Sequence, residues 1–120
     1  MNTKVLGGQG EKIALEFLRG QGCRLVVQNF RLRAGEIDLV VMDGGCLCFV
    51  EVKTRKGRHH PQEAVSIVKQ RKLTRLAKLF MLRQFHRLDL KSRFDVVAVE
   101  TDESGSPRVK WLRNAFDAVE

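Results

Sequence analysis

Residues 35–55 read GEIDLVVMDGGCLCFVEVKTR, and this stretch decides the fold. Two runs of strand-forming residues, 36–42 and 46–54, lie on either side of Asp43-Gly44-Gly45. An Asp followed by Gly between two such runs is typical of a tight hairpin turn. The stretch therefore predicts two antiparallel strands that pair directly with each other.

This hairpin is expected to gather its charged side chains on one face. With the turn centred on its two glycines, Asp38 lies directly opposite Glu51. The same register places Glu36 opposite Lys53. Because side chains alternate between faces along a strand, all four point to the same side. A register shifted by one residue would move Asp38 among apolar side chains, so the pattern favours this pairing.

The other positions of the hairpin are apolar on both faces. The face with the charges continues with Val40, Met42, Leu47 and Phe49. The opposite face consists of Ile37, Leu39, Val41, Cys46, Cys48, Val50 and Val52. A sheet that is apolar on both sides is expected to be covered on both sides, so we expect helices to pack against each face.

The rest of the chain supplies helices and further strands. Apolar residues recur at helical spacing over 5–20, and again from Pro61 to about Phe85. Strand patterns follow at 24–30, 94–100 and 109–112. The predicted order is α-β-β-β-α-β-β, an α/β fold with a mixed sheet flanked by helices. We expect residues 1–120 to form a single domain.

The charge of the chain indicates a polyanionic partner. It has 22 Lys and Arg residues against 14 Asp and Glu residues, a net charge of +8 and a pI near 9.9. Such an excess favours nucleic acid, because Lys and Arg neutralise phosphates and release counterions. A soluble basic protein without such a partner is the alternative. No helix combines a basic face with an aromatic apolar face, so no membrane partner is expected.

Cysteine usage and hydropathy favour the cytoplasm. No apolar run has the length of a membrane helix, and no signal peptide pattern is found. The three cysteines, Cys23, Cys46 and Cys48, are an odd number without disulfide or zinc spacing. Cys46 and Cys48 are interpreted as small buried apolar residues on one face of their strand.

Opposed carboxylates on a covered face need a counter-charge, because they repel each other and are costly to bury unpaired. Mg²⁺ (or Mn²⁺) binds carboxylate oxygens, keeps several waters and sits readily between protein and phosphate. We expect Asp38 and Glu51, with the backbone carbonyl of Val52, to bind the ion. Lys53 would orient or deprotonate the attacking water. The alternative is a Glu36–Lys53 ion pair that leaves both acids at a wet sheet edge.

Two motifs, Gly35-Glu36-Ile37-Asp38 and Phe49-Val50-Glu51-Val52-Lys53-Thr54-Arg55, resemble the PD-(D/E)XK nuclease superfamily, whose core is α-β-β-β-α-β. From about Gly8 to Val99 the chain more closely resembles the bacterial YraN family, which is similar to archaeal Holliday junction resolvases. Further supporting residues are Gly10-Glu11, Asn29-Phe30-Arg31 and Arg93-Phe94-Asp95-Val96-Val97. Ile37 stands before Asp38 where the superfamily pattern has proline.

The resemblance implies a restriction-endonuclease-like core and places Asp38, Glu51 and Lys53 on metal-binding and catalytic positions. Glu11 matches a first-helix acid that resolvase-like members add to the metal site. Taken without the resemblance, Glu11 is interpreted as a solvated helix glutamate. Glu36 is expected to support the site.

Basic and polar residues around this centre are candidates for contacts with nucleic-acid phosphates. Some approach the first hairpin strand, some follow the second, and some lie on the second helix: Arg31, Arg33, Arg55, Lys56, Arg58, Lys69 and Gln70. Trp111 and Phe116 could stack on bases, but a core or interface role is favoured. Arg93 and Asp95, two apart on one strand, are expected to pair, with a dimer contact as the alternative.

Together these features predict a Mg²⁺-dependent endonuclease that hydrolyses DNA phosphodiester bonds by direct attack of water, with no organic cofactor. Branched or junction DNA is the substrate class that the resemblance adds. A homodimer stays open, because symmetric cuts at a junction would need two copies. The alternative is a non-catalytic DNA- or RNA-binding accessory protein that retains a nuclease fold.

Overall fold

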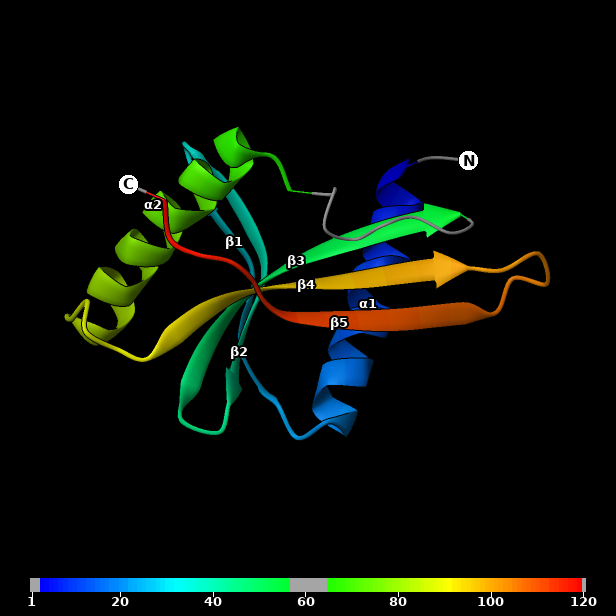
Figure 1. The fold of residues 1–120 in the computed structure, drawn as a ribbon, viewed down its shortest axis with the longest axis horizontal. Coiled ribbons are helices and arrows are strands. Elements are labelled where there is room, and N and C mark those ends of the chain that lie inside the picture. The colour runs from blue at the N-terminus through cyan, green and yellow to red at the C-terminus, as the bar shows by residue number, and fades with distance from the viewer. Residues whose placement is uncertain (1–2, 57–64, 120) are drawn as a thin grey trace.

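The computed structural model describes residues 3–56 and 65–119, and these form a mixed sheet with two helices (Figure 1). The elements in chain order are α1 Thr3–Gly20, β1 Arg24–Leu32, β2 Gly35–Asp43, β3 Cys46–Lys56, α2 Ile67–Phe85, β4 Ser92–Thr101 and β5 Pro107–Phe116. The five strands lie in the order β1-β2-β3-β4-β5, and only β3 and β4 are parallel among these pairs. The predicted α-β-β-β-α-β-β order and mixed sheet are confirmed. Neither described helix is long and apolar enough to cross a membrane.

The second helix begins later than its sequence pattern predicts. Ser66 has an extended backbone and its Oγ accepts the N–H of Lys69 at 3.2 Å, so α2 begins at Ile67. The prediction of helix from Pro61 is therefore wrong at Val65 and Ser66, and Pro61 itself lies outside the described residues. The predicted end at Phe85 is confirmed. There His86 takes a left-handed conformation with φ 58°.

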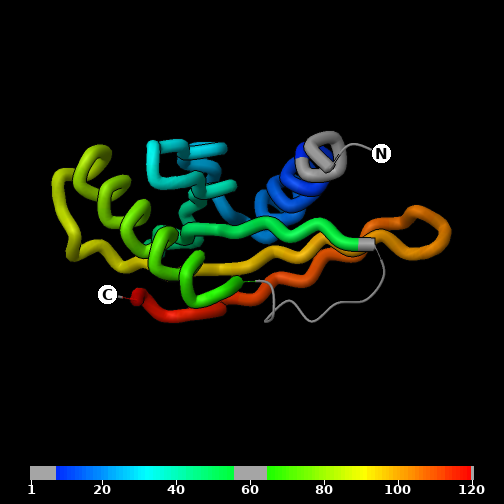
Figure 2. The backbone as a smooth tube through the Cα atoms, turned by 90° about the horizontal axis from the view of Figure 1, so that it is seen from above, coloured from blue at the N-terminus to red at the C-terminus, as the bar shows by residue number. Residues whose placement is uncertain are grey.

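The register predicted for the hairpin is confirmed from its turn as far as the Leu39–Val50 pair. Beyond that pair β2 continues against β1, whereas β3 continues against β4. Asp38 and Glu51 are therefore not a ladder pair, and neither are Glu36 and Lys53, because the two strands separate there. Figure 2 shows the β1–β2 hairpin rising away from the layer of β3, β4 and β5.

Each face of the sheet packs against one helix, as expected. The α2 side buries Val40, Leu47, Phe49, Leu73, Leu76, Ala77, Phe80, Phe94 and Val96. The α1 side buries Ala14, Leu15, Leu18, Leu39, Val41, Cys46, Cys48, Val50, Val97 and Val99. The prediction that Ile37 shares a face with Leu39 and Val41 is wrong, because Ile37 lies in the core on the α2 side. The alternation of faces is broken at Asp38, where β2 turns away from β3.

Candidate metal centre

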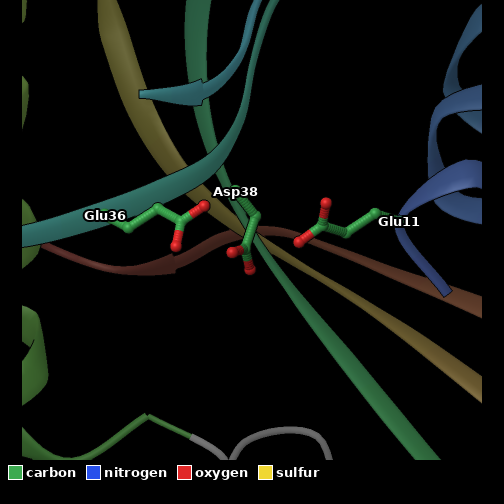
Figure 3. Close-up of side chains that lie close together, drawn as sticks. All are labelled: Glu11, Glu36 and Asp38. Carbon is green, nitrogen blue, oxygen red and sulfur yellow. The ribbon is translucent and has the colours of Figure 1, made fainter. Parts of the chain in front are cut away.

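Three carboxylates converge where β2 separates from β3. Glu36 and Asp38 come from β2, and Glu11 comes from α1. One oxygen of each lies within 4.8 Å of the others. Figure 3 shows Glu11 and Glu36 approaching Asp38 from opposite sides. The sequence predicted Asp38, Glu51 and Glu11 as ligands and Glu36 as a support. Among the described residues the structure groups Asp38 with Glu11 and Glu36, and Glu51 is not part of this group.

Asp38 is the centre of this group and is held by the opposite strand. Its Oδ2 accepts the backbone N–H of Val52 at 2.8 Å. This bond satisfies a donor of β3 that β2 no longer pairs. Burial and the neighbouring Glu51 carboxylate raise the pKa of Asp38 from 3.8 to about 7, although the Val52 N–H opposes that rise. Burial and the nearby carboxylates therefore destabilise the negative charge of Asp38 more than the Val52 N–H stabilises it.

Glu51 faces two lysines. Its side chain is only 5% exposed, and its Oε1 contacts the ammonium groups of Lys69 and, at 3.6 Å, Lys53. Lys53 follows two residues later on β3, so the strand period places both on one side. Burial lowers the pKa of Lys53, although Glu51 opposes that effect. The structure thus brings Glu51 and Lys53 together, as their spacing predicts, and adds Lys69 from α2.

Glu11 reaches the site because α1 lies very close to β3 at the preceding residue. A Cβ built on Gly10 would lie 2.0 Å from Thr54 Oγ1. No larger residue fits there without a shift, so the glycine sets how near Glu11 comes to Asp38. Burial and the Glu36 carboxylate raise the pKa of Glu11. In the sequence, only the family resemblance carried by Gly10-Glu11 pointed to Glu11.

Asn29 is a site residue that sequence reasoning did not assign. It lies on β1 with φ 53°, a left-handed conformation that asparagine tolerates better than most residues. With its amide oriented to face the acids, its nitrogen donates to Glu36 Oε1 at 2.7 Å and to Glu11 Oε2 at 3.1 Å. Asn29 therefore links the two outer carboxylates.

The predicted nucleic-acid residues differ in their surroundings. Arg31, three-quarters exposed, pairs with Glu36 at 3.3 Å. Arg33 and Arg55 are exposed, Lys56 ends β3, and Arg58 lies outside the described residues. Lys69 contacts Glu51, whereas the Gln70 amide donates to the Val65 carbonyl at 3.1 Å and secures the approach to α2. Their contacts with nucleic acid remain predictions.

A second polar cluster lies away from the acids and is structural. Arg93 Nε donates to Asp95 Oδ1 at 3.0 Å, which confirms the pairing expected from their spacing. Asp95 is fully buried and also accepts from Trp111 Nε1 and the Asn114 N–H, both at 2.9 Å. These bonds fix β5 against β4 beside the register shift between Phe94 and Val96. Trp111 is thereby held at the sheet.

Comparison with known proteins shows the family. Residues 10–99 match the family described as "Uncharacterised protein family UPF0102", and the chain belongs to it. A UPF0102 protein of Symbiobacterium thermophilum is 49% identical over 118 residues, which cover 97% of this chain and 99% of that protein. One of Geobacter sulfurreducens is 41% identical, covering 97% of this chain and 91% of that protein.

Among solved structures, the chain is similar to Pyrococcus furiosus SfsA in complex with Ca²⁺. The sequence identity is 16% and the TM-score is 0.42. The likeness covers 93% of this chain and 64% of that one.

Proposed function

We propose that this protein is a Mg²⁺-dependent endonuclease, also able to use Mn²⁺, that hydrolyses DNA phosphodiester bonds. The observation that supports this most is the convergence of Glu11, Glu36 and Asp38, whose oxygens lie within 4.8 Å of one another. Like-charged groups at such distances destabilise a fold unless a cation or protons compensate them. The resemblance of the two hairpin motifs to PD-(D/E)XK nucleases supports the same reading.

The donor set fits a hard divalent cation. It consists of carboxylates, with no Cys or His in the group, and oxygen ligands of this kind suit Mg²⁺ and Mn²⁺. Asp38 and Glu11 from this group, together with Glu51 and the Val52 carbonyl from β3, would hold the ion, and Glu36 would support them. When bound, the cation would neutralise charge on the phosphate and make nearby water more acidic.

Lys53 would act on the water molecule. Its side chain is one-fifth exposed and lies beside Glu51, so its Nζ can hydrogen-bond a water near the acids and orient it for attack, while the proton of that water passes to solvent. The water oxygen then bonds to phosphorus, the bond from phosphorus to one ester oxygen breaks, and that oxygen leaves with a proton from solvent. No covalent link to the protein forms on this route.

The DNA would lie along the basic residues beside the acids. Arg31 stands next to Glu36, and the exposed side chains of Arg33 and Arg55 flank the same strands. Their charges would hold phosphates on either side of the scissile bond. Branched or junction DNA, cut by a homodimer in the cytoplasm, is the form of the proposal that the resolvase resemblance supports.

A non-catalytic nucleic-acid-binding protein is the second candidate, and one contact favours it. Glu51 already has two ammonium partners among the described residues, so part of the acidic charge is compensated by the chain itself. In this case the basic surface would bind DNA or RNA, and the acids would serve the fold alone.

The test compares wild type with Asp38→Asn and Glu51→Gln on supercoiled and four-way-junction DNA, with Mg²⁺, Mn²⁺ or EDTA. Asp117→Asn, which removes an exposed carboxylate beyond β5, is the matched control. We expect metal-dependent nicking by wild type and the control, and its loss in both site variants. Cleavage that persists in both site variants would refute the proposal. Binding of DNA without cleavage by any form would favour the second candidate.

A further inference from the structure

We propose that Lys69 competes with the divalent cation for Glu51, so that α2 controls how tightly the centre binds its metal. This inference rests on the proposed function, because it concerns the same site. Its basis is the contact between the Lys69 ammonium and Glu51 Oε1, which joins the first turn of α2 to β3.

The competition follows from what an ammonium and a metal ion both need. Both are cations that bind carboxylate oxygens, and an ammonium paired with Glu51 neutralises the negative charge that would attract a metal ion. Two positive charges beside one carboxylate also repel each other. Since Lys53 also lies 3.6 Å from Glu51 Oε1, a divalent cation there would meet two ammonium charges, and its binding is favoured when the ammonium of Lys69 leaves.

Lys69 is the partner that can leave. The Glu51 side chain is 5% exposed and that of Lys53 is 20% exposed, whereas that of Lys69 is 41% exposed. Its backbone stays fixed, because its N–H donates to the Ser66 cap. Rotation of the flexible stem carries the ammonium from Glu51 into water without moving the helix.

The released ammonium would remain at the edge of the site. Anchored by the first turn of α2, it stays within reach of an anionic group that approaches the acids. Lys69 thus neutralises Glu51 when no metal is bound, and offers its charge to a phosphate when metal and DNA are both present. Toward the metal it is a positioning residue, because its effect on metal binding acts through Glu51.

The experiment measures Mn²⁺ binding by calorimetry, without DNA, for wild type, Lys69→Met and Lys69→Gln. Lys72→Met is the matched control, because it removes the same charge from an exposed position of the same helix. Lys69→Arg keeps the charge. We expect both uncharged Lys69 variants to bind Mn²⁺ roughly fivefold to tenfold more tightly than Lys72→Met, the range between an exposed and a buried ion pair. Lys69→Arg should bind much as wild type does.

The outcomes separate this inference from the proposed function. Suppose that wild type binds Mn²⁺, that Asp38→Asn does not, and that both uncharged Lys69 variants bind no more tightly than wild type. This result would overturn the competition and leave the proposed metal centre intact. Absence of binding in wild type and in every Lys69 variant overturns both. Binding that appears only when Lys69 loses its charge supports the competition in its strongest form.

Discussion

Asp38→Asn should stabilise the metal-free protein at neutral and alkaline pH, although it is expected to abolish activity. Burial and the nearby Glu51 and Glu11 carboxylates raise the pKa of Asp38 from 3.8 to about 7. Between those pH values the folded state keeps a proton that the unfolded chain releases. The free energy of unfolding therefore falls as pH rises through this window, and it levels off above pH 7.

The magnitude follows from the width of the window. Each pH unit between the two pKa values corresponds to about 1.4 kcal/mol, so the complete effect is about 4 kcal/mol. Because the carboxylates around Asp38 interact with one another, this cost does not belong to Asp38 alone, and we expect Asp38→Asn to recover about 2–4 kcal/mol. The amide oxygen can still accept the Val52 N–H, which limits the structural change.

The assay is urea unfolding in EDTA, followed by circular dichroism between pH 4.5 and pH 8. The advantage of Asp38→Asn over wild type should be small at the acidic end and largest at pH 8. Added Mg²⁺ should stabilise wild type and leave the variant unchanged. Asp117→Asn, at an exposed position, should follow wild type throughout. Equal stability of Asp38→Asn and wild type at pH 8 in EDTA would refute the idea that the negative charge of Asp38 is destabilised.

Three further predictions concern residues that shape the site or the sheet. Gly10→Ala should lower the free energy of unfolding by about 1–3 kcal/mol, because its methyl would lie 2.0 Å from Thr54 Oγ1. In urea unfolding Thr54→Ala should recover most of that loss, and Gly8→Ala, which meets nothing within 4 Å, should cause none. Asn29→Asp should lower the melting temperature in EDTA, because the amide that donates to two carboxylates is replaced by a third acid. Mn²⁺ should restore the melting temperature. An unchanged melting temperature in EDTA would contradict the linking role of Asn29. Asp95→Ala should cost about 3–5 kcal/mol in urea unfolding, because the Trp111 Nε1–H and the Asn114 N–H lose their acceptor and the half-buried Arg93 guanidinium is left with Asp43. A cost below about 1 kcal/mol, the range of an exposed ion pair, would contradict the structural role.

The hairpin was predictable from its own residues because its information is local. The Asp-Gly-Gly turn fixes the register, and the alternation of apolar residues fixes the faces, so the pairs next to the turn agree with the structure. The same reasoning failed at Ile37. A strictly alternating strand assumes a continuous ladder, and nothing in residues 35–55 indicates that β2 leaves β3 at Asp38.

The site was only partly predictable for a related reason. Asp38, Glu51 and Lys53 lie within one hairpin, and their spacing alone brings them near one another. Glu11 arrives from another element and was assigned only through resemblance to a family. The contacts of Asn29 and Lys69 depend on how β1 and α2 pack. An asparagine or a lysine at these positions could equally well be exposed to solvent, so the sequence did not indicate the contacts.

The separation of the two strands is what makes a site possible at this place. In a continuous ladder, the Val52 N–H would bond to a backbone carbonyl of β2, and the cross-strand side chains would fill the face between them. Where β2 departs, that N–H takes the Asp38 carboxylate instead, and the strand edges no longer cover the acids. The gap admits Glu11 from the α1 side and the Lys69 ammonium from the α2 side. The β2–β3 pairing ends at Leu39 and Val50, so Asp38 does not pair with Glu51 as the sequence predicted. Instead, the Asp38 side chain links β2 to β3 through the Val52 N–H.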